Sequence, residues 1–228
     1  MLYLVGTPIG NLADITLRAL ETLRTVDLIA AEDTRHSLRL LGRHEIRKPL
    51  VSFHEHNEAR RTQELLTRLQ AGENIALITD AGLPSISDPG ARLVRACVAA
   101  GVHYTVIPGP SAVLTAVVGS GLSAERFHYG GFLPPKSGGR ERDLQIALDR
   151  AETSIFFESP HRLERTLEVL ARLAPERQVC VARELTKQFE EFRRGPAAEV
   201  FAHYQQHPPK GEITLVIAGS EEAAKQKL

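Results

Sequence analysis

The part of the sequence best suited to chemistry is a loop at residues 79–90 (TDAGLPSISDPG), which holds two aspartates, two glycines and two prolines. It follows a short apolar run, residues 75–78, and precedes a helix-like segment that Gly101 ends. Strand-to-helix connections usually take about 2–6 residues. Glycine lets backbone approach a ligand, proline stiffens a loop, and open α/β sheets bind ligands at the carboxyl ends of their strands. We therefore interpret the loop as a ligand-binding segment; a long ordinary turn is the alternative.

Two further turns have the same character. Residues 5–11 (VGTPIGN) end the first predicted strand, and residues 108–111 (PGPS) follow the fifth. The first turn is not a GxGxxG motif and lacks the lysine of a phosphate-binding loop. Three strands that end in Gly/Pro turns with small side chains predict one cleft for a flat, polar small molecule.

Charged residues follow the second predicted strand at residues 31–35 (AEDTR). Either the two carboxylates and the arginine position a substrate, or Asp33 caps a helix and pairs with Arg35 at the surface. Arginines then recur every four residues, at 35, 39, 43 and 47. They form either a phosphate-contacting patch or a solvated surface. Gly42 is expected to end the helix, so the arginines need not share one face.

Other polar clusters leave alternatives open. His54 and His56 are predicted to lie on one strand face, but no third ligand for a metal is evident, so no metal is predicted. Residues 158–162 (ESPHR) and 183–187 (RELTK) each follow a buried strand. They form either a second wall of a cleft or helix caps and interdomain ion pairs.

Composition limits the possible partners. The chain has 228 residues, 28 Lys+Arg and 28 Asp+Glu, so a global basic field for nucleic acid is absent and any such partner must be held by a local patch. Cys97 and Cys180 stand in apolar runs, which argues against a disulfide framework. No segment approaches the ~20 apolar residues of a membrane span. We expect a cytoplasmic protein with no membrane partner.

The element pattern predicts an α/β protein with two domains. The N-terminal α/β domain, residues 1–119, has a mainly parallel sheet, and the C-terminal domain, residues 120–228, is mixed α/β. Asp14 and Asn57 are expected to cap helices. Predicted strands are 2–5, 28–31, 50–53, 75–78, 104–107, 154–157, 179–182, 189–194 and 213–218; predicted helices in the second domain are about 140–150 and 163–173.

Seven motifs carry a resemblance to a known family, and they occur in order over essentially the whole chain. They are residues 5–14 (VGTPIGNLAD), 31–35 (AEDTR), 80–90 (DAGLPSISDPG), 108–111 (PGPS), 131–134 (GFLP), 158–162 (ESPHR) and 182–187 (ARELTK). Together they resemble the tetrapyrrole methylase superfamily, and within it the methyltransferases that act on small-subunit ribosomal RNA.

The resemblance implies two α/β domains of the tetrapyrrole methylase type, with S-adenosylmethionine in the interdomain cleft. It also implies a homodimer that methylates the 2′-oxygen of a cytidine ribose in the decoding region of 16S ribosomal RNA, either as free RNA or in the 30S particle. Carried over by position, the cofactor-binding residues are Pro8, Asp80, Ala81, Gly82, Ser111, Ala112, Phe157, Arg183, Glu212 and Ile213.

Methyl transfer to a ribose hydroxyl needs alignment, and a base or a nearby cation helps because the hydroxyl is a weak nucleophile. The candidate catalytic residues are Glu32, Asp33, Arg35, Glu158, Arg162, Glu184 and Lys187. The alternatives are a methylase of the same fold that acts on a tetrapyrrole or a protein side chain, and a non-catalytic ribosome-associated module. Members of this family often continue into a small helical domain, whereas this sequence ends after a short Glu/Ala/Lys tail. It is therefore either a short member or a truncated chain.

Overall fold

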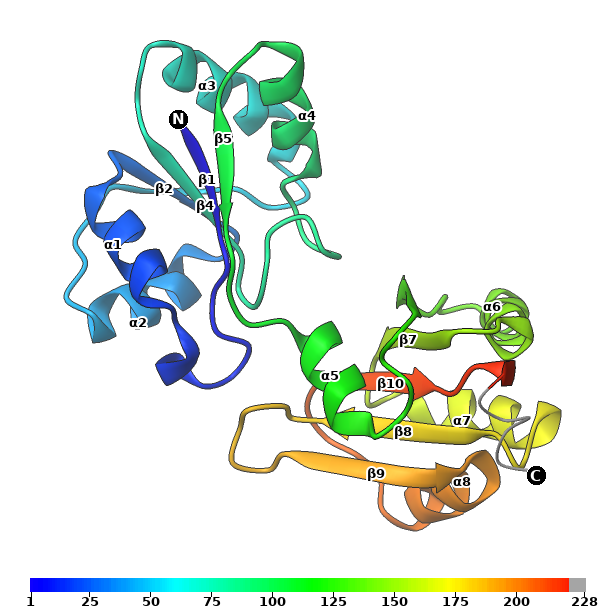
Figure 1. The fold of residues 1–228 in the computed structure, drawn as a ribbon. Helices are drawn as coiled ribbons and strands as arrows, with labels where there is room; N and C mark the ends of the chain where they lie inside the picture. The colour runs from blue at the N-terminus through cyan, green and yellow to red at the C-terminus, as the bar shows by residue number, and fades with distance from the viewer. Residues whose placement is uncertain (222–228) are drawn as a thin grey trace. The chain divides into compact units, whose positions relative to one another are not determined.

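A computed structural model describes residues 1–221, and the part of the Glu/Ala/Lys tail from residue 222 on lies outside the described residues. The chain forms two compact units: an N-terminal unit, Met1–Ser111, and a C-terminal unit that starts at Ala112 (Figure 1). The change of unit thus falls before residue 119, where we expected the domain boundary, because the helix that starts at Ala112 packs on the second sheet. No helix among the described residues is long and apolar enough to cross a membrane.

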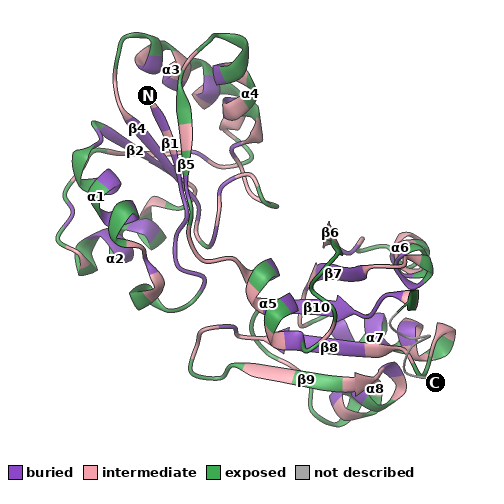
Figure 2. Cartoon of the chain, viewed as in Figure 1, coloured by how far each residue is buried: buried purple, intermediate pink, exposed green. Residues whose placement is uncertain are grey.

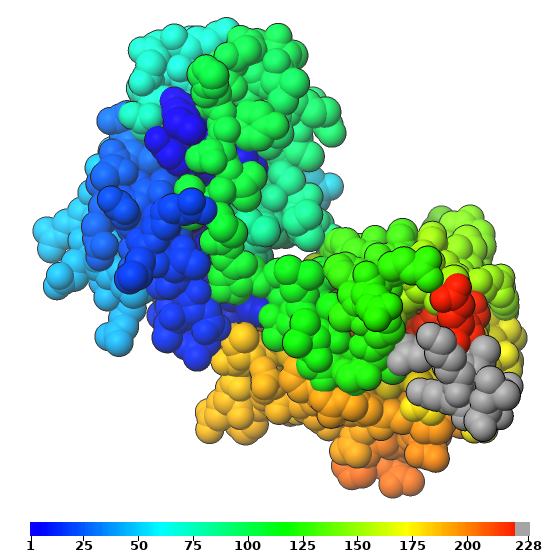
Figure 3. Space-filling view, in the orientation of Figure 1, coloured from blue at the N-terminus to red at the C-terminus, as the bar shows by residue number. Residues whose placement is uncertain are grey.

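The N-terminal unit contains a five-stranded parallel sheet in the order β3-β2-β4-β1-β5. The strands are β1 (Leu2–Val5), β2 (Leu28–Ala31), β3 (Leu50–Ser52), β4 (Ile75–Ile78) and β5 (Tyr104–Ile107). Strand β5 is an edge strand that exposes Tyr104 and Val106. This segment, in green, faces the viewer in the space-filling view (Figure 3). The predicted parallel sheet is confirmed.

Helices cover both faces of this sheet, as Figure 1 shows. They are α1 (Leu17–Thr25) and α2 (Thr34–Arg43) on one face, and α3 (Glu58–Gln70) and α4 (Ala91–Ala99) on the other. Neighbouring residues along a strand point to opposite faces. Accordingly Ile29 joins the core beneath α1 and α2, whereas Leu28 joins the core beneath α3 and α4. The central strands are buried on both sides, which explains their continuous apolar sequence.

The C-terminal unit contains a mixed sheet in the order β6-β7-β10-β8-β9. Its strands are β6 (Phe127–Phe132), β7 (Thr153–Glu158), β8 (Gln178–Arg183), β9 (Glu191–Pro196) and β10 (Ile213–Ile217). Over the residues that the structure describes, β6 and β7 pair in parallel and the other three strand pairs are antiparallel. The predicted antiparallel pairing of the segment near residues 189–194 is confirmed, two residues further along the chain.

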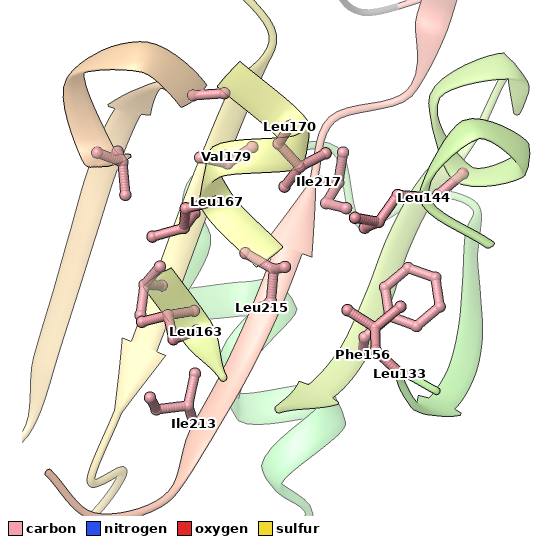
Figure 4. Close-up of a cluster of buried hydrophobic side chains, with 14 of the residues drawn as sticks. Leu133, Leu144, Phe156, Leu163, Leu167, Leu170, Val179, Ile213, Leu215 and Ile217 are labelled. Atoms are coloured by element: carbon pink, nitrogen blue, oxygen red, sulfur yellow. The ribbon is translucent and has the colours of Figure 1, made fainter. Parts of the chain in front are cut away.

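Helices α6 (Ser137–Asp149), α7 (Leu163–Leu173) and α8 (Ala197–Gln206) cover one face of the second sheet. Figure 4 shows the resulting core, in which Leu163, Leu167 and Leu170 of α7 point at the strands. Helix α5 (Ala112–Ser120) packs on β8, β9 and β10 from the other side. The burial colouring shows β8 and β10 as mainly buried, whereas the edge strand β9 is half-buried or exposed (Figure 2).

Local details differ from the sequence-based expectations. Helix α1 is capped by Thr16, whose side chain accepts from the Ala19 amide, whereas Asp14 lies in a short 3-10 turn, η1 (Leu12–Asp14). Asn57 holds the N-cap position of α3 but accepts a hydrogen bond from the His54 amide instead of from the helix. Gly42 does not end α2, which continues to Arg43.

The carboxyl ends of β1 and β5 approach so closely that only glycine fits. A Cβ on Gly6 would lie 2.8 Å from the Cα of Gly109, a separation that backbone atoms must move to relieve. We predict that Gly6→Ala lowers the free energy of unfolding by about 1–3 kcal/mol, the usual cost of overpacking.

Gly42→Ala is the matched control, because nothing lies within 4 Å of its added Cβ in α2. It should stabilise the protein by about 0.5–1 kcal/mol, since alanine is the better helix former. Urea unfolding of both variants measures the difference. A neutral Gly6→Ala would contradict the close contact.

Candidate functional site

The loops that follow β1 and β4 are joined at the carboxyl edge of the first sheet. The Thr7 amide donates to the Gly82 carbonyl at 2.9 Å, and the Gly82 amide donates back to the Thr7 carbonyl at 3.2 Å. The Thr7 hydroxyl also donates to the Thr79 carbonyl at 3.0 Å. Gly82 makes this bridge with φ of +79°, a conformation that favours glycine. The turns after β1 and β4 therefore meet at this edge, while the cleft that we expect them to line stays a prediction.

The loops after β2 and β4 are joined in a similar reciprocal way. The Asp80 amide donates to Glu32 Oε2 at 3.3 Å, and the Asp33 amide donates to Asp80 Oδ1 at 3.2 Å. Asp33 also caps α2, since its Oδ1 accepts from the Arg35 amide at 2.8 Å. Glu32, Asp33 and Asp80 thus lie together at one edge, although Asp80 is 48 residues from Glu32 and 47 residues from Asp33 in the sequence.

The remaining first-unit candidates lie near this edge. Pro8 and Gly82 are buried, Ala81 is exposed, and Ser111 follows the Pro108–Pro110 turn at the end of β5. Ala112 is the first residue of α5 and belongs to the C-terminal unit. The end of the 79–90 loop is held by Glu58, whose Oε1 accepts from the Gly90 amide at 3.0 Å.

The carboxylates at this edge have altered acidity. Burial raises the pKa of Glu32, and the charges of Asp80 and Asp33 add to this, while the Asp80 amide and His54 oppose it. Burial and the charge of Glu32 raise the pKa of Asp88 to about 7, against an opposing contribution from the Thr79 side chain. A carboxylate that titrates near neutral pH suits general acid–base chemistry.

Asp88 was missed by the sequence reasoning. Its only signal was its place as the second aspartate of the 79–90 loop, and nothing in the linear sequence indicates that it is half-buried or that the charge of Glu32 acts on it.

Arg35 has a different environment from these carboxylates. Its side chain is 94% exposed, and its nearest carboxylate atom, Asp33 Oδ1, is 3.9 Å away. The pKa of Asp33 is lowered, mainly because its carboxylate accepts the hydrogen bond from the Arg35 amide. Asp33 is therefore a helix cap, while the Arg35 guanidinium remains accessible to an anionic ligand.

The second-unit candidates also converge, at one end of the mixed sheet. Ile213, the first residue of β10, pairs with Glu158 of β7 and with Arg183 of β8. Phe157 and Glu212 are the sequence neighbours of two of these residues. The half-buried Phe157 ring contacts Phe132 edge-to-face at a centroid distance of 5.3 Å. Antiparallel pairing therefore explains how residues from three distant segments meet.

Glu158 and Arg162 support each other inside the C-terminal unit. The fully buried Glu158 side chain accepts from the Thr166 hydroxyl and from the Ser159 amide, each at 2.6 Å, and it pairs with Arg162 at 2.8 Å. Arg162 also donates to the Leu133 carbonyl at 3.1 Å. These contacts use both carboxylate oxygens, so the pair fixes the end of β7 against the start of α7.

Glu184, Lys187 and Glu212 form a second closed network. Lys187 Nζ lies 2.8 Å from Glu184 Oε1 and 2.8 Å from Glu212 Oε2. Burial acts to raise the pKa of Glu184, but the hydrogen bonds from Lys187 and the Glu212 backbone outweigh it and the pKa is lowered. For Lys187, burial acts to lower the pKa, but the hydrogen bonds and charges of its two carboxylate partners outweigh this effect and the pKa is raised. Both groups are therefore held in their charged forms.

Arg183 is fixed in the same region, since its Nε donates to Glu191 at 3.0 Å and its Nη1 donates to the Lys210 carbonyl at 3.2 Å.

The positions of His54 and His56 in the first unit differ from the expected ones. Strand β3 ends at Ser52, so His54 and His56 lie in the following turn with ring centroids 5.9 Å apart. The prediction that they share a strand face is wrong.

Comparison with known proteins gives matches over most of the chain. The family model of tetrapyrrole (corrin/porphyrin) methylases matches residues 1–200. Proteins named ribosomal RNA small subunit methyltransferase I are similar: that of Synechocystis is 52% identical over 96% of this chain and 79% of its own length. That of Thermotoga maritima is 47% identical over 96% of this chain and 99% of its own length.

Solved structures share the fold at low sequence identity. The uroporphyrin-III-C-methyltransferase of Thermus thermophilus has a TM-score of 0.66 and 22% identity, covering 100% of this chain and 98% of its own. The methyltransferase CobJ has a TM-score of 0.71 and 18% identity, covering 96% of this chain and 94% of its own. These likenesses concern the fold alone.

The acidity of Asp88 generates a prediction about stability. A carboxyl whose pKa is raised on folding stabilises the folded state at low pH, and this contribution is lost as pH rises from about 4 to about 7. Asp88→Asn should therefore stabilise the protein relative to wild type at pH 8 but not at pH 4. We expect about 1–3 kcal/mol, less than the ~4 kcal/mol to which such a change in pKa corresponds, because solvent screens the charge.

Urea unfolding at the two pH values measures the effect. Asp149→Asn on α6, which removes an exposed carboxylate, serves as the control. Equal effects of Asp88→Asn at both pH values would contradict the prediction.

Proposed function

Because the chain belongs to the tetrapyrrole (corrin/porphyrin) methylase family, we propose that it transfers a methyl group from S-adenosylmethionine to small-subunit ribosomal RNA. The similarity to curated ribosomal RNA small subunit methyltransferases I, near 50% identity over almost the whole chain, supports this substrate. The finer proposal is that the acceptor is the ribose 2′-hydroxyl of a cytidine in the decoding region of 16S RNA.

The single observation that carries the proposal is the joined loop system at the carboxyl edge of the first sheet. The 79–90 loop is bonded to the turn after β1 through Thr7 and Gly82, and to the segment after β2 through Asp80 and Glu32. Preorganised loops at strand ends suit the alignment of a cofactor, which is the main contribution that a protein makes to a displacement reaction.

The chemistry of this edge fits the proposed cofactor. S-adenosylmethionine carries a sulfonium and an ammonium cation, and when bound it supplies an electrophilic methyl group. Glu32, Asp80 and Asp88 are carboxyl groups, which attract a cation in their ionised forms, and Ala81 and Gly82 lie between the two aspartates in the sequence. We propose that Pro8, Asp80, Ala81 and Gly82 hold the methionine part, with Ser111 and Ala112 nearby. For the adenosine we propose Phe157, Arg183, Glu212 and Ile213.

For the transfer step we propose Glu32 as the group that takes the proton of the hydroxyl. Its half-buried carboxylate and raised pKa suit this role. The exposed Arg35 is placed to hold a phosphate. Glu158, Arg162, Glu184 and Lys187 act in this scheme as positioning residues, because their charges are already paired within the C-terminal unit.

A dimeric state also belongs to the proposal. The edge strand β5 pairs with β1 on one side only among the described residues, and it exposes Tyr104 and Val106, which a partner subunit would cover.

The test of the activity is incubation with labelled S-adenosylmethionine and small ribosomal subunits from a strain that lacks this methylation. Digestion of the RNA should yield label in 2′-O-methylcytidine. Label in a base, in protein or in an added tetrapyrrole would contradict the proposal, as would no transfer.

Asp80→Ala is predicted to weaken S-adenosylmethionine binding by about tenfold or more, which corresponds to about 1.4 kcal/mol or more. The change removes one carboxylate from the edge and also removes the acceptor of the Asp33 amide. Isothermal titration calorimetry gives the affinity directly.

Asp27→Ala is a matched control at the opposite ends of the same two strands. Asp27 Oδ2 accepts from the Asn74 amide at 2.8 Å, before β2 and β4 begin, as Asp80 accepts from Asp33 after they end. Both changes remove a hydrogen bond between the same pair of loops, but only Asp80→Ala should change the cofactor affinity. Equal affinities in the two variants would remove Asp80 from the site.

A further inference from the structure

Helix α2 carries three arginines on one exposed face. Because α2 continues through Gly42 to Arg43, Arg35, Arg39 and Arg43 recur at one-turn intervals, and all three are exposed. The residues that α2 buries, Ser37, Leu40 and Leu41, lie on the opposite side of the helix. We name Arg35, Arg39 and Arg43 the α2 arginine stripe.

The stripe is not balanced by neighbouring acids. Within the described residues, Arg39 and Arg43 have no ion pair, and Arg35 has only the exposed contact with Asp33 at 3.9 Å. Residues 34–48 contain five basic side chains and one acidic side chain, in a chain whose total charge is zero. Like charges four residues apart destabilise a helix. A cation in the first turn, such as Arg35, also opposes the helix dipole. Arg43, in the last turn, is favourable to the dipole, but the repulsion within the stripe and the position of Arg35 lower the stability of α2. A bound anion would offset that cost.

The α2 arginine stripe begins at the same edge of the first sheet as the 79–90 loop. Asp33 caps α2 through the Arg35 amide, and the Asp33 amide donates to Asp80 at 3.2 Å. The N-terminus of α2 is thus attached to the 79–90 loop. From Arg35 to Arg43 the stripe extends about 12 Å along the helix axis, at about 1.5 Å per residue.

We propose that the α2 arginine stripe binds consecutive phosphates of the RNA strand next to the methylated nucleotide. The inference rests on the proposed function and names the surface that receives its substrate. A guanidinium binds phosphate oxygens in a bidentate manner, and a row of three matches an extended polyanion better than a single small ligand. A local stripe also explains how a chain of zero net charge binds RNA. The exposed Leu38 lies beside the stripe, and an exposed apolar side chain can also belong to a protein interface. The experiment must therefore distinguish RNA binding from binding of a protein partner.

The test is the double charge reversal Arg39→Glu with Arg43→Glu. The probe is a fluorescein-labelled RNA oligonucleotide with the decoding-region sequence, and fluorescence anisotropy gives its affinity over a series of salt concentrations. Each phosphate contact to a single strand contributes about 0.7 to the slope of log affinity against log salt concentration. Loss of two contacts should therefore reduce the slope by about 1.4 and lower the affinity at least about tenfold at low salt. The affinity for S-adenosylmethionine should not change.

Two control variants make the outcome specific. Arg92→Glu with Arg95→Glu makes the same charge change on exposed positions of α4, on the opposite face of the sheet, and should leave the slope unchanged. Arg39→Lys with Arg43→Lys keeps the charge and should retain most of the slope.

The stripe inference is overturned if the α2 reversal leaves the slope and the affinity at wild-type values, or if the α4 reversal reduces them equally. It is also overturned if the α2 reversal changes only the sedimentation mass, because the stripe then binds protein. A wild-type chain that methylates RNA in any of these cases leaves the proposed function intact. A wild-type chain that binds the oligonucleotide through the stripe but transfers no methyl group contradicts the proposed function instead.

Discussion

The reciprocal hydrogen bonds between loops at the carboxyl edge of the first sheet are the constraint on which the rest of the account depends. The bridge between Thr7 and Gly82 and the exchange between Asp80, Glu32 and Asp33 fix three loops against each other. Each loop alone would be a mobile connection, and ordering it only on binding would cost affinity. Because folding has already ordered the three loops, their acidic groups lie close together before any ligand binds. Burial of those groups then raises the pKa values of Glu32 and Asp88.

The polar groups of the two units have different roles in this account. In the C-terminal unit, Glu158 and Glu184 have strong partners in Arg162 and Lys187, so their charges are used in fixing the strand ends. In the N-terminal unit, Arg35 is exposed and Asp88 titrates near neutral pH. Groups with partly unsatisfied charge are the ones that can change state during a reaction. We therefore place the proposed chemistry on the first unit and the proposed positioning role on the second.

The sequence predicted the sheet elements well because buried strands leave a strong local signal. The apolar runs at 28–31 and 75–78 coincide with β2 and β4, and helix α7 has the predicted bounds. Helix ends and short helices were predicted less well, because tertiary packing rather than local sequence determines them. Gly42 is tolerated inside α2 because Leu40 and Leu41 are buried beside it. Helix α8 was not predicted, since it follows Gly195 and Pro196 and its stability comes from the buried Val200 and Tyr204.

The candidate site was predicted in part for the same reason. Strand-end motifs indicated Asp80 and Glu32 as candidates, but the raised pKa of Asp88 depends first on its burial and then on the charge of Glu32, which is more than fifty residues away in sequence. The most direct measurement of the central claim is a crystal structure of the protein with S-adenosylmethionine bound. We expect electron density for the methionine part against residues 80–82, within hydrogen-bonding distance of that backbone or of Asp80. Density for the cofactor at any place remote from the 79–90 loop would contradict it.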